Sequence, residues 1–402
     1  MILVEAVQGK STAEQTVEIV ERKGKGHPDS ICDAIMESIS VALCQTYMRE
    51  FGRILHHNID KGLLAAGRTE KRFGGGKVLR PMQLIIGDRA TFRAEGNEIP
   101  VNDIAVDAAK RWIRENLRSV DPEGDVDYRS VLAEGSEELV SIFAGPADVR
   151  GANDTSAAIG YYPLSPTENV ILELERYLNS REFKERFPDT GEDAKVMGLR
   201  KEDALSITVA MPLLCRHISS EEMYFTRKRE IHQDMLAFLN RFRNKDFKHF
   251  TVHYNTLDLQ GRGLNGVYLS LLGTSAEDAD SGQVGRGNAV NGVIPLFRPM
   301  GTEAVAGKNP VSHVGKIYSV LAHNTAKTIY EGVEDIKEAH VFLLSRIGDP
   351  IDRPRMANVK LLLQRGRETK KATNQAKEIM ESALGSILRL CDELAAGKYP
   401  IC

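Results

Sequence analysis

Strand-like and helix-like segments follow one another along this chain of 402 residues without regular alternation. Apolar residues recur at helical spacing in some segments and in extended or alternating patterns in others. The expected helices span 28–50, 104–117, 165–180, 220–242 and 367–395, and residues 309–332 are expected to form a long helix or a pair of helices. The expected strands span 54–66, 77–91, 157–162, 205–214, 247–257 with 266–273 as its partner, 339–346 and 359–364. A doubly wound parallel sheet requires strict alternation, so this order favours an α+β fold with antiparallel sheets.

Three connecting segments carry further expectations. Residues 68–76 are the basic, glycine-rich tip of a long hairpin formed by the strands on either side, and we expect this tip to be mobile. The acidic segment from 119 to 136 lacks apolar periodicity and is expected to be a lid or a linker. Ser165-Pro-Thr-Glu168 has the capping-box pattern with proline in the first turn, so a helix is expected to begin there.

Charge and cysteine content exclude several functional classes. The chain has 53 basic and 56 acidic residues and a formal net charge of -3, so no overall positive field attracts nucleic acid or an acidic membrane surface. No segment approaches the ~18 consecutive apolar residues of a membrane span. The cysteines form no Cys-x-x-Cys pair, which favours free thiols, a reducing compartment and hence the cytoplasm. Any binding of anions must therefore be local.

The segment Glu21-Arg-Lys-Gly-Lys-Gly-His-Pro-Asp-Ser-Ile-Cys-Asp33 predicts an anion site at the start of a helix. Its two glycines allow close approach of the backbone to a ligand, and its proline suits the first helical turn. His27 and Asp29 then lie where backbone N–H groups and the helix dipole favour bound phosphate. On local grounds a structural interpretation is equally open, in which Asp29 caps the helix and His27 packs beneath it.

The segment from 273 to 316 is rich in glycine and charge and has almost no apolar periodicity. Its stretch 301–309 has five residues between the glycines where a P-loop has four, and its stretch 285–292 places the third glycine too late for a dinucleotide fingerprint. Its charged side chains include Asp278, Asp280, Arg286, Arg298, Lys308, His313 and Lys316. Glycines, cations and carboxylates together favour phosphate handling with a divalent metal, and an ordinary surface loop is the alternative.

A third segment, Arg150-Gly-Ala-Asn-Asp-Thr-Ser-Ala-Ala-Ile-Gly160, surrounds one carboxylate with small residues. Close approach of its backbone to a ligand is one interpretation. The other is an Asx turn before a strand, which the local sequence alone favours. No Gly-x-Ser-x-Gly elbow occurs, so acyl transfer has little support.

Taken in order, four motifs resemble the S-adenosylmethionine synthetase (methionine adenosyltransferase) family, in its archaeal-type branch. They are Gly26-His-Pro-Asp29, Gly151-Ala-Asn-Asp154, the segment from Asp280 to Gly287, and Gly307-Lys-Asn-Pro310, with the flanks Asp154-Thr-Ser156 and Val290-Asn-Gly-Val-Ile-Pro295. The resemblance covers nearly the whole chain. It implies three interleaved α+β subdomains related by pseudo-threefold symmetry, with approximate bounds 20–135, 136–280 and 281–402.

The resemblance also implies a reaction. Members of that family join the sulfur of L-methionine to C5′ of ATP and release triphosphate, which is hydrolysed to pyrophosphate and phosphate. It further implies Mg²⁺ and K⁺ as cofactors and a homodimer with active sites at the subunit interface. A thioether sulfur has no proton to lose, so the attack needs no general base, and the site must instead stabilise charge on the leaving triphosphate.

Site residues follow from their positions in the matched motifs. The resemblance implies that His27 contacts the departing oxygen and phosphates, and that Lys308 and Arg286 are phosphate cations. It implies that Asp29 holds Mg²⁺ and that Asp60 lies near K⁺. The implied ATP- and methionine-binding residues are Gly151, Ala152, Asn153, Asp154, Thr155, Ser156, Asp203, Asp280 and His313, of which Asp154 and Asp280 match acids that hold the methionine ammonium or the ribose hydroxyls.

Several positions depart from the bacterial and eukaryotic branch of that family. Ser30 and Gly287 each stand where that branch has lysine, and Gly315 stands where it has a metal-binding aspartate, so the second metal ligand is not identified. His313 falls at another lysine position, which leaves its charge at neutral pH open. A metal-dependent triphosphatase or kinase and a non-catalytic nucleotide-sensing subunit are the alternative functions.

Overall fold

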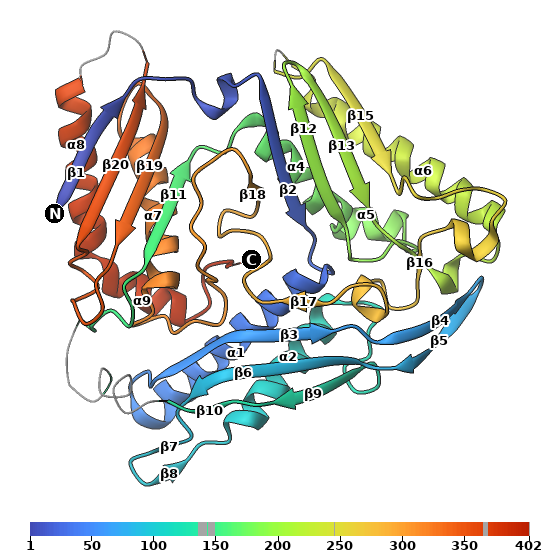
Figure 1. Cartoon of the computed structure of the whole chain (residues 1–402), viewed down its shortest axis with the longest axis horizontal. Helices are drawn as coiled ribbons and strands as arrows, with labels where there is room; N and C mark the ends of the chain where they lie inside the picture. The colour runs from blue at the N-terminus through green and yellow to red at the C-terminus, as the bar shows by residue number, and fades with distance from the viewer. Residues whose placement is uncertain (136–142, 144–148, 245, 365–368, 402) are drawn as a thin grey trace.

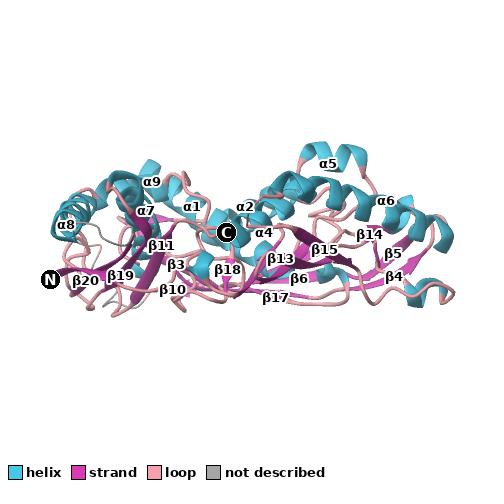
Figure 2. Ribbon diagram, turned by 90° about the horizontal axis from the view of Figure 1, so that it is seen from above, coloured by secondary structure: helices cyan, strands magenta, loops and turns pink. Residues whose placement is uncertain are grey.

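The computed structural model describes residues 1–135, 143, 149–244, 246–364 and 369–401. Three β-sheets of four or five strands surround a central irregular segment, which Figure 1 shows in orange between β17 and α7. Figure 2 shows that the long helices lie mostly on one side of the sheets, which leaves the opposite sheet faces largely free of long helices. Mixed sheets packed with helices confirm the predicted α+β class, and the subdomain bounds stay a prediction.

The first sheet is built on the predicted long hairpin, which is confirmed because β3 and β6 pair antiparallel. Helix α1 (Pro28–Phe51) packs on β3, and α2 (Val101–Asn116) packs on α1 and β9. The strands, in spatial order, are β10 (Ala133–Glu134), β6 (Met82–Ala90), β3 (His57–Ala65) and β17 (Gly282–Gln283), with β9 (Val126–Ser130) also paired to β6.

The acidic segment from 119 to 136 is not a lid or a linker where it forms β9 and β10. Strands β9 and β10 both run parallel to β6, so backbone hydrogen bonds hold them in the first sheet. The prediction was wrong there because β9, Val126-Asp-Tyr-Arg-Ser130, is too short to show a clear apolar period. Residue 136 lies outside the described residues.

The hairpin tip is docked against the neighbouring part of the chain. It continues as β4 (Arg68–Arg72) and β5 (Gly75–Arg80), and the N–H of Gly74 between them donates to the carbonyls of Cys215 (3.1 Å) and Ile218 (2.8 Å). We expected a mobile tip, whereas these bonds tie it to the turn after β14. A further short hairpin joins β7 (Arg93–Ala94) and β8 (Asn97–Glu98).

The second sheet combines β2 with strands from the middle of the chain. Its order is β15 (His249–Tyr254), β13 (Ala204–Ala210), β12 (Lys195–Lys201), β2 (Val17–Lys23) and β18 (Ile294–Pro295), with helices α4 (Pro166–Leu178), α5 (Arg181–Arg186) and α6 (Glu221–Leu239) packed nearby. Strand β12 was not predicted. Residues 266–273 do not pair with β15, because β16 (Leu269–Ser270) pairs with β14 (Leu213–Leu214) and β15 pairs with β13.

The third sheet joins the two ends of the described chain. Its order is β1 (Ile2–Val7), β20 (Met356–Leu363), β19 (Ile336–Leu344) and β11 (Ala157–Tyr162), next to helices α7 (Val314–Gly332), α8 (Thr369–Gly385) and α9 (Ile387–Ala395). The expected closing helix is therefore two helices, and its first residues lie outside the described ones. Within the described part of the chain, no helix is long and apolar enough to cross a membrane.

Helix α1 shows how local sequence positions the site. Its N-cap is His27, its first residue is Pro28, and it ends where Gly52 adopts a left-handed φ of 65°. Ile31, Ile35 and other apolar residues bury one face against β3. The capping box predicted at the start of α4 is also present, with Ser165 and Glu168 each bonded to the other's backbone.

Close packing of β11 on α7 depends on a glycine. A Cβ on Gly160 would lie 2.3 Å from backbone atoms of Ala322 and His323 in α7. We therefore expect Gly160→Ala to lower the free energy of unfolding by about 2 to 3 kcal/mol, measured by urea denaturation. The control is Gly385→Ala, which meets nothing within 4 Å and should leave stability unchanged or raise it by about 0.5 kcal/mol. Equal stability of both variants would contradict the prediction.

Candidate active site

The central loop, residues 283–308, lies along one polar face of α1. Asp29, Asp33, Glu37 and Ser40 recur at the spacing that places side chains on one side of a helix. The contacts are Gln283 N–H to Asp29 (2.9 Å), Gly285 N–H (2.7 Å) and Gly287 N–H (3.0 Å) to Asp33, Gly307 N–H to Glu37 (2.9 Å), and Ser40 Oγ–H to the Lys308 carbonyl (3.1 Å). Helix α1 thus fixes the backbone that carries Arg286 and Lys308.

Gly287, one of the departures noted in the sequence, is explained by this packing. A Cβ at this position would lie 2.1 Å from Oδ2 of Asp33, so no side chain fits while the loop is bound to α1. Burial raises the pKa of Asp33 to about 7, and the two loop N–H groups oppose that shift. The backbone of the loop therefore supplies the hydrogen bonds that a charged Asp33 needs.

The His27 cluster consists of Lys23, His27 and Asp29 and lies where β2 ends and α1 begins. Nδ1 of His27 accepts the N–H of Asp29 at 3.2 Å, so Nε2 carries the proton of the neutral ring. Lys23 Nζ lies 2.9 Å from Asp29 Oδ2, and all three side chains are buried. Burial lowers the pKa of His27 to about 4, although the charge of Asp29 opposes the shift. His27 is therefore a neutral hydrogen-bond donor at pH 7.

Two residues at the start of β12 border the His27 cluster and were missed by the sequence reasoning. Lys195 stands opposite Lys23 in the antiparallel ladder of β12 and β2. Asp193 is buried and accepts hydrogen bonds from the backbone N–H (2.8 Å) and Oγ (2.5 Å) of Ser275. Gly26 packs so tightly here that a Cβ on it would lie 2.5 Å from Asp193 N. The sequence signal was the charged pair of Asp193 and Lys195 next to a strand, but that strand was not predicted.

The Lys308 cluster consists of Asp60, Glu303, Lys308 and His313. Nζ of Lys308 contacts Glu303 Oε2 and lies 3.5 Å from Asp60 Oδ2, and Lys308 is 3% exposed. Burial lowers the pKa of His313 to about 3, and the charge of Lys308 lowers it further. The His313 ring is therefore neutral at pH 7. Glu303 was not predicted, because it lies in the stretch 301–309, which fails the P-loop pattern, and outside the matched motif that begins at Gly307.

The segment from Gly151 to Ser156 borders the Lys308 cluster. Asn153 Oδ1 accepts the N–H of Val314 at 3.1 Å and so binds the first turn of α7. Ser156 Oγ donates to Glu303 Oε1 at 2.9 Å. The remaining predicted residues of the segment are Ala152, which is buried, and Asp154 and Thr155, which are exposed. The backbone N–H of Thr155 donates to Asp154 Oδ1 at 2.7 Å, so a local polar turn coexists with the contacts to the cluster.

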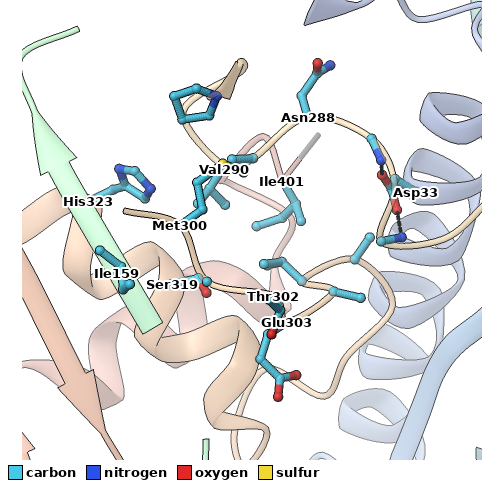
Figure 3. Close-up of a pocket in the computed structure, with 18 of the residues that line it drawn as sticks. Asp33, Ile159, Asn288, Val290, Met300, Thr302, Glu303, Ser319, His323 and Ile401 are labelled. Atoms are coloured by element: carbon cyan, nitrogen blue, oxygen red, sulfur yellow. Dashed lines mark hydrogen bonds between the residues drawn. The ribbon is translucent and has the colours of Figure 1, made fainter. Parts of the chain in front are cut away.

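A pocket opens between the central loop, β11 and α7 (Figure 3). Asp33 and Asn288 lie on one side of it and His323 on the other. Glu303 belongs to the lining, but Figure 3 shows its carboxylate directed away from Asp33. Glu303 therefore links this pocket to the Lys308 cluster.

A buried hydrogen-bond chain supports the backbone of Lys308. The side-chain amide nitrogen Nδ2 of Asn309 lies 3.2 Å from Nδ1 of His57. The other ring nitrogen, Nε2, lies 2.8 Å from Ser40 Oγ, and Ser40 Oγ lies 3.1 Å from the carbonyl oxygen of Lys308. An amide nitrogen only donates and a carbonyl only accepts. All these contacts are satisfied together when Nε2 of His57 carries the proton and Nδ1 accepts. His57 is thus a positioning residue for Lys308.

Because of this buried hydrogen-bond chain, His57 makes the stability of the protein sensitive to acid. Burial lowers its folded-state pKa to about 3, whereas the unfolded value is near 6.5. Its contribution to stability is therefore present above pH 6.5 and lost as the pH falls toward 3. Between pH 6.5 and 4.5 the wild-type protein should lose about 2 kcal/mol more unfolding free energy than His57→Gln, measured by urea denaturation. Parallel pH curves for the two proteins would show that His57 takes up its proton equally in both states.

The two clusters lie apart in one chain. They contact α1 near Asp29 and near Ser40, which are about 16 Å apart along the helix axis. Asp280 is exposed and lies on the His27 side, where its charge opposes the burial that lowers the pKa of His27. The exposed Arg286 is on the same side, since its carbonyl accepts a 2.5 Å bond from Lys23. One chain therefore brings the predicted residues other than Asp203 together as two groups.

Asp203 is the predicted site residue that joins neither cluster. It is partly exposed at the turn between β12 and β13, and its carboxylate pairs with Lys248 at 2.7 Å. Lys195, which borders the His27 cluster, lies at the other end of β12, so the length of the strand places Asp203 about 20 Å from it. Its contact with nucleotide stays a prediction.

The acidic side chains suit Mg²⁺ or K⁺ only in part. Hard cations prefer oxygen ligands, and Asp29, Asp60 and Glu303 supply carboxylates. Among the described residues, no group of three or more His, Cys, Asp or Glu side chains is placed to hold a metal ion. A cation held by these carboxylates would therefore need ligand oxygens, such as those of phosphates, to complete its coordination.

Comparison with known proteins identifies the family. The sequence model of S-adenosylmethionine synthetase (AdoMet synthetase) matches residues 1–398. The chain belongs to the S-adenosylmethionine synthetase family. It is similar to the S-adenosylmethionine synthases of Aeropyrum pernix, at 44% identity over 100% of this chain and 99% of that protein, and of Methanothermobacter thermautotrophicus, at 40% identity over 99% and 98%.

The fold agrees with this membership. The solved structure of an unusual S-adenosylmethionine synthetase from Campylobacter jejuni superposes with a TM-score of 0.62, at 15% identity, over 95% of this chain and 94% of that chain. Membership in the S-adenosylmethionine synthetase family confirms the archaeal-type assignment and the enzyme class, methionine adenosyltransferase. It also supports formation of S-adenosylmethionine from ATP and methionine, and metal dependence in general, without naming the metals.

Proposed function

We propose that this protein forms S-adenosylmethionine by attack of the methionine sulfur on C5′ of ATP, and that it hydrolyses the released triphosphate to pyrophosphate and phosphate. The observation that carries the proposal is the pair of clusters at the two ends of the central loop. Each presents buried cations and carboxylates on a backbone held by α1. Such groups suit a polyphosphate leaving group, whereas sulfur attack requires no base.

The roles of the residues follow from their charge states. His27 is a neutral donor through Nε2 and would donate to the departing oxygen as negative charge develops on it. Lys308, Lys195 and Arg286 would bind phosphate oxygens. Asp29 would hold Mg²⁺, and Asp60 would lie beside K⁺. Bound Mg²⁺ would neutralise charge on the triphosphate. Preorganised charges of this kind stabilise the transition state without reorganisation during the reaction.

We also propose that the active protein is a homodimer whose sites lie at the subunit interface. The two clusters are too far apart in one chain to hold a single triphosphate, and two chains related by symmetry would place each His27 cluster opposite a Lys308 cluster. The face of the sheets that is largely free of long helices (Figure 2) is suited to such contact. Leu3, Leu63 and Leu199 are 44%, 39% and 46% exposed. Gly62 and Gly198, which precede Leu63 and Leu199 in their strands, face helices, so the two leucines lie on the opposite face of their sheets.

The direct test is an assay of products. The purified protein with ATP, methionine, Mg²⁺ and K⁺ should yield the sulfonium product together with pyrophosphate and phosphate, measured by mass spectrometry and phosphate analysis. Omitting methionine should abolish the pyrophosphate. Phosphate release that is indifferent to methionine would favour a triphosphatase, and the absence of sulfonium product under varied metal conditions would refute the proposal. A cytoplasmic location stays part of the proposal.

A further inference from the structure

The ammonium group of Lys308 is enclosed by carboxylates. Glu303 Oε2 contacts Nζ directly, and Asp60 Oδ2 lies 3.5 Å away. Lys308 is 3% exposed, so water screens these charges poorly. Ser156 Oγ holds the second oxygen of Glu303 at 2.9 Å and fixes the orientation of the carboxylate. Asp60 is shared with a second cation, because Lys61 Nζ lies 2.5 Å from its other oxygen, whereas Glu303 pairs with Lys308.

A notch beside this group is left by Gly315. A Cβ at Gly315 would lie 2.9 Å from Glu303 Oε2, 2.9 Å from Lys308 Nζ and 3.3 Å from His313 Nδ1. His313 is 8% exposed, and its buried Nδ1 has no hydrogen-bond partner among the described residues. A buried polar atom without a partner is costly, so its position at the notch indicates that a polar ligand belongs there.

The charges determine which polar ligand can enter. A polyphosphate without a cation would have to approach Lys308 beside the carboxylate of Glu303, which would repel its negative charges and compete with them for the ammonium group. A polyphosphate that carries a divalent cation brings compensating positive charge to Glu303 and Asp60, while Lys308 still meets phosphate oxygens. The carboxylate that distinguishes the two ligands is Glu303, because it contacts the Lys308 ammonium directly and Ser156 fixes its orientation.

We propose that Glu303 is a specificity-determining residue, which restricts the Lys308 cluster to polyphosphate complexed with a divalent cation. The inference rests on the proposed function, since it takes Lys308 to be a phosphate ligand. It assigns to Glu303 a role that the sequence motifs do not indicate.

The test is calorimetric binding of imidotriphosphate, a hydrolysis-resistant polyphosphate, to the full-length protein with Mg²⁺ and with EDTA. The wild-type protein should bind at least 10-fold more weakly in EDTA. Glu303→Gln removes the charge and should bind the metal-free ligand at least 10-fold more tightly than wild type, which would shrink the effect of Mg²⁺. Glu334→Gln removes the same charge from an exposed turn between α7 and β19 and should behave as wild type.

Two results would overturn the inference. One is metal-free binding by Glu303→Gln that is no tighter than wild type. The other is an equal gain in the Glu334→Gln control, which would assign the effect to overall charge. If Glu303→Gln does not fold, Glu303→Asp tests the same point: its carboxylate is one methylene shorter and should partly relax the metal requirement. Unchanged binding by Lys308→Ala would instead refute the phosphate role of Lys308, and hence the proposed function at this cluster.

Discussion

The His27→Ala and Lys308→Ala proteins are expected to form the sulfonium product about 10²- to 10³-fold more slowly than wild type, with methionine affinity changed about threefold or less. Both side chains would act on the leaving triphosphate, where charge grows only as the C5′–O bond breaks. Interactions made mainly in the transition state lower kcat and leave substrate binding largely intact. Single-turnover product formation and equilibrium binding of methionine measure the two effects separately.

A matched control for this result is His249→Ala. His249 is an exposed histidine at the start of β15, near Asp203 and remote from both clusters. It should turn over at the wild-type rate. Equal losses of methionine affinity and of rate in His27→Ala or Lys308→Ala would argue for a general disturbance of the site and against a leaving-group role.

Mixing the His27→Ala and Lys308→Ala chains is expected to restore activity. If each site takes His27 from one subunit and Lys308 from the other, a mixed dimer has one doubly altered site and one fully wild-type site. Random association of equal amounts would then give about a quarter of wild-type activity. Co-refolded or co-expressed chains, assayed for S-adenosylmethionine, provide the measurement. Activity no higher than that of either variant alone would place both clusters of a site in one chain.

A second mixture controls for stabilisation by mixing alone. His27→Ala and Asp29→Ala both alter the His27 cluster, so each site in their mixed dimer keeps one damaged cluster. This mixture should stay inactive. Recovery there as well would mean that dimer exchange itself rescues the variants, and the test of a shared site would fail.

The parts of the fold that were predictable are those set by local chemistry. Proline and glycine marked the bounds of α1, and Ser165 with Glu168 marked the start of α4. The pairing of distant strands was not predictable, because a single sequence carries no register between them. We expected residues 266–273 to pair with β15, whereas its partner is β13. Strand β12, which lies between β2 and β13 in the second sheet, was missed.

The same limit applies to the candidate site. Motifs indicated His27, Asp29 and Lys308 because glycine and proline mark their backbones. Glu303 lies between Gly301 and Gly307 but outside the matched motif, and only folding brings its carboxylate to Lys308. Lys195 reaches the His27 cluster through the ladder of β12 with β2, and Asp193 lies two residues before that strand. Asp203, two residues after β12, is held at the far end of that strand.

The polar face of α1 has a consequence for how this chain can vary. Both clusters are anchored to a single helix, so their separation and relative rotation are set by the number of residues between Asp29 and Ser40. One inserted residue in that interval would turn everything after it by about 100° and advance it by about 1.5 Å. The contacts at Glu37 and Ser40 would then point away from the central loop. The length of α1 between Asp29 and Ser40 is therefore fixed, and substitutions in this interval are far easier to accommodate than insertions.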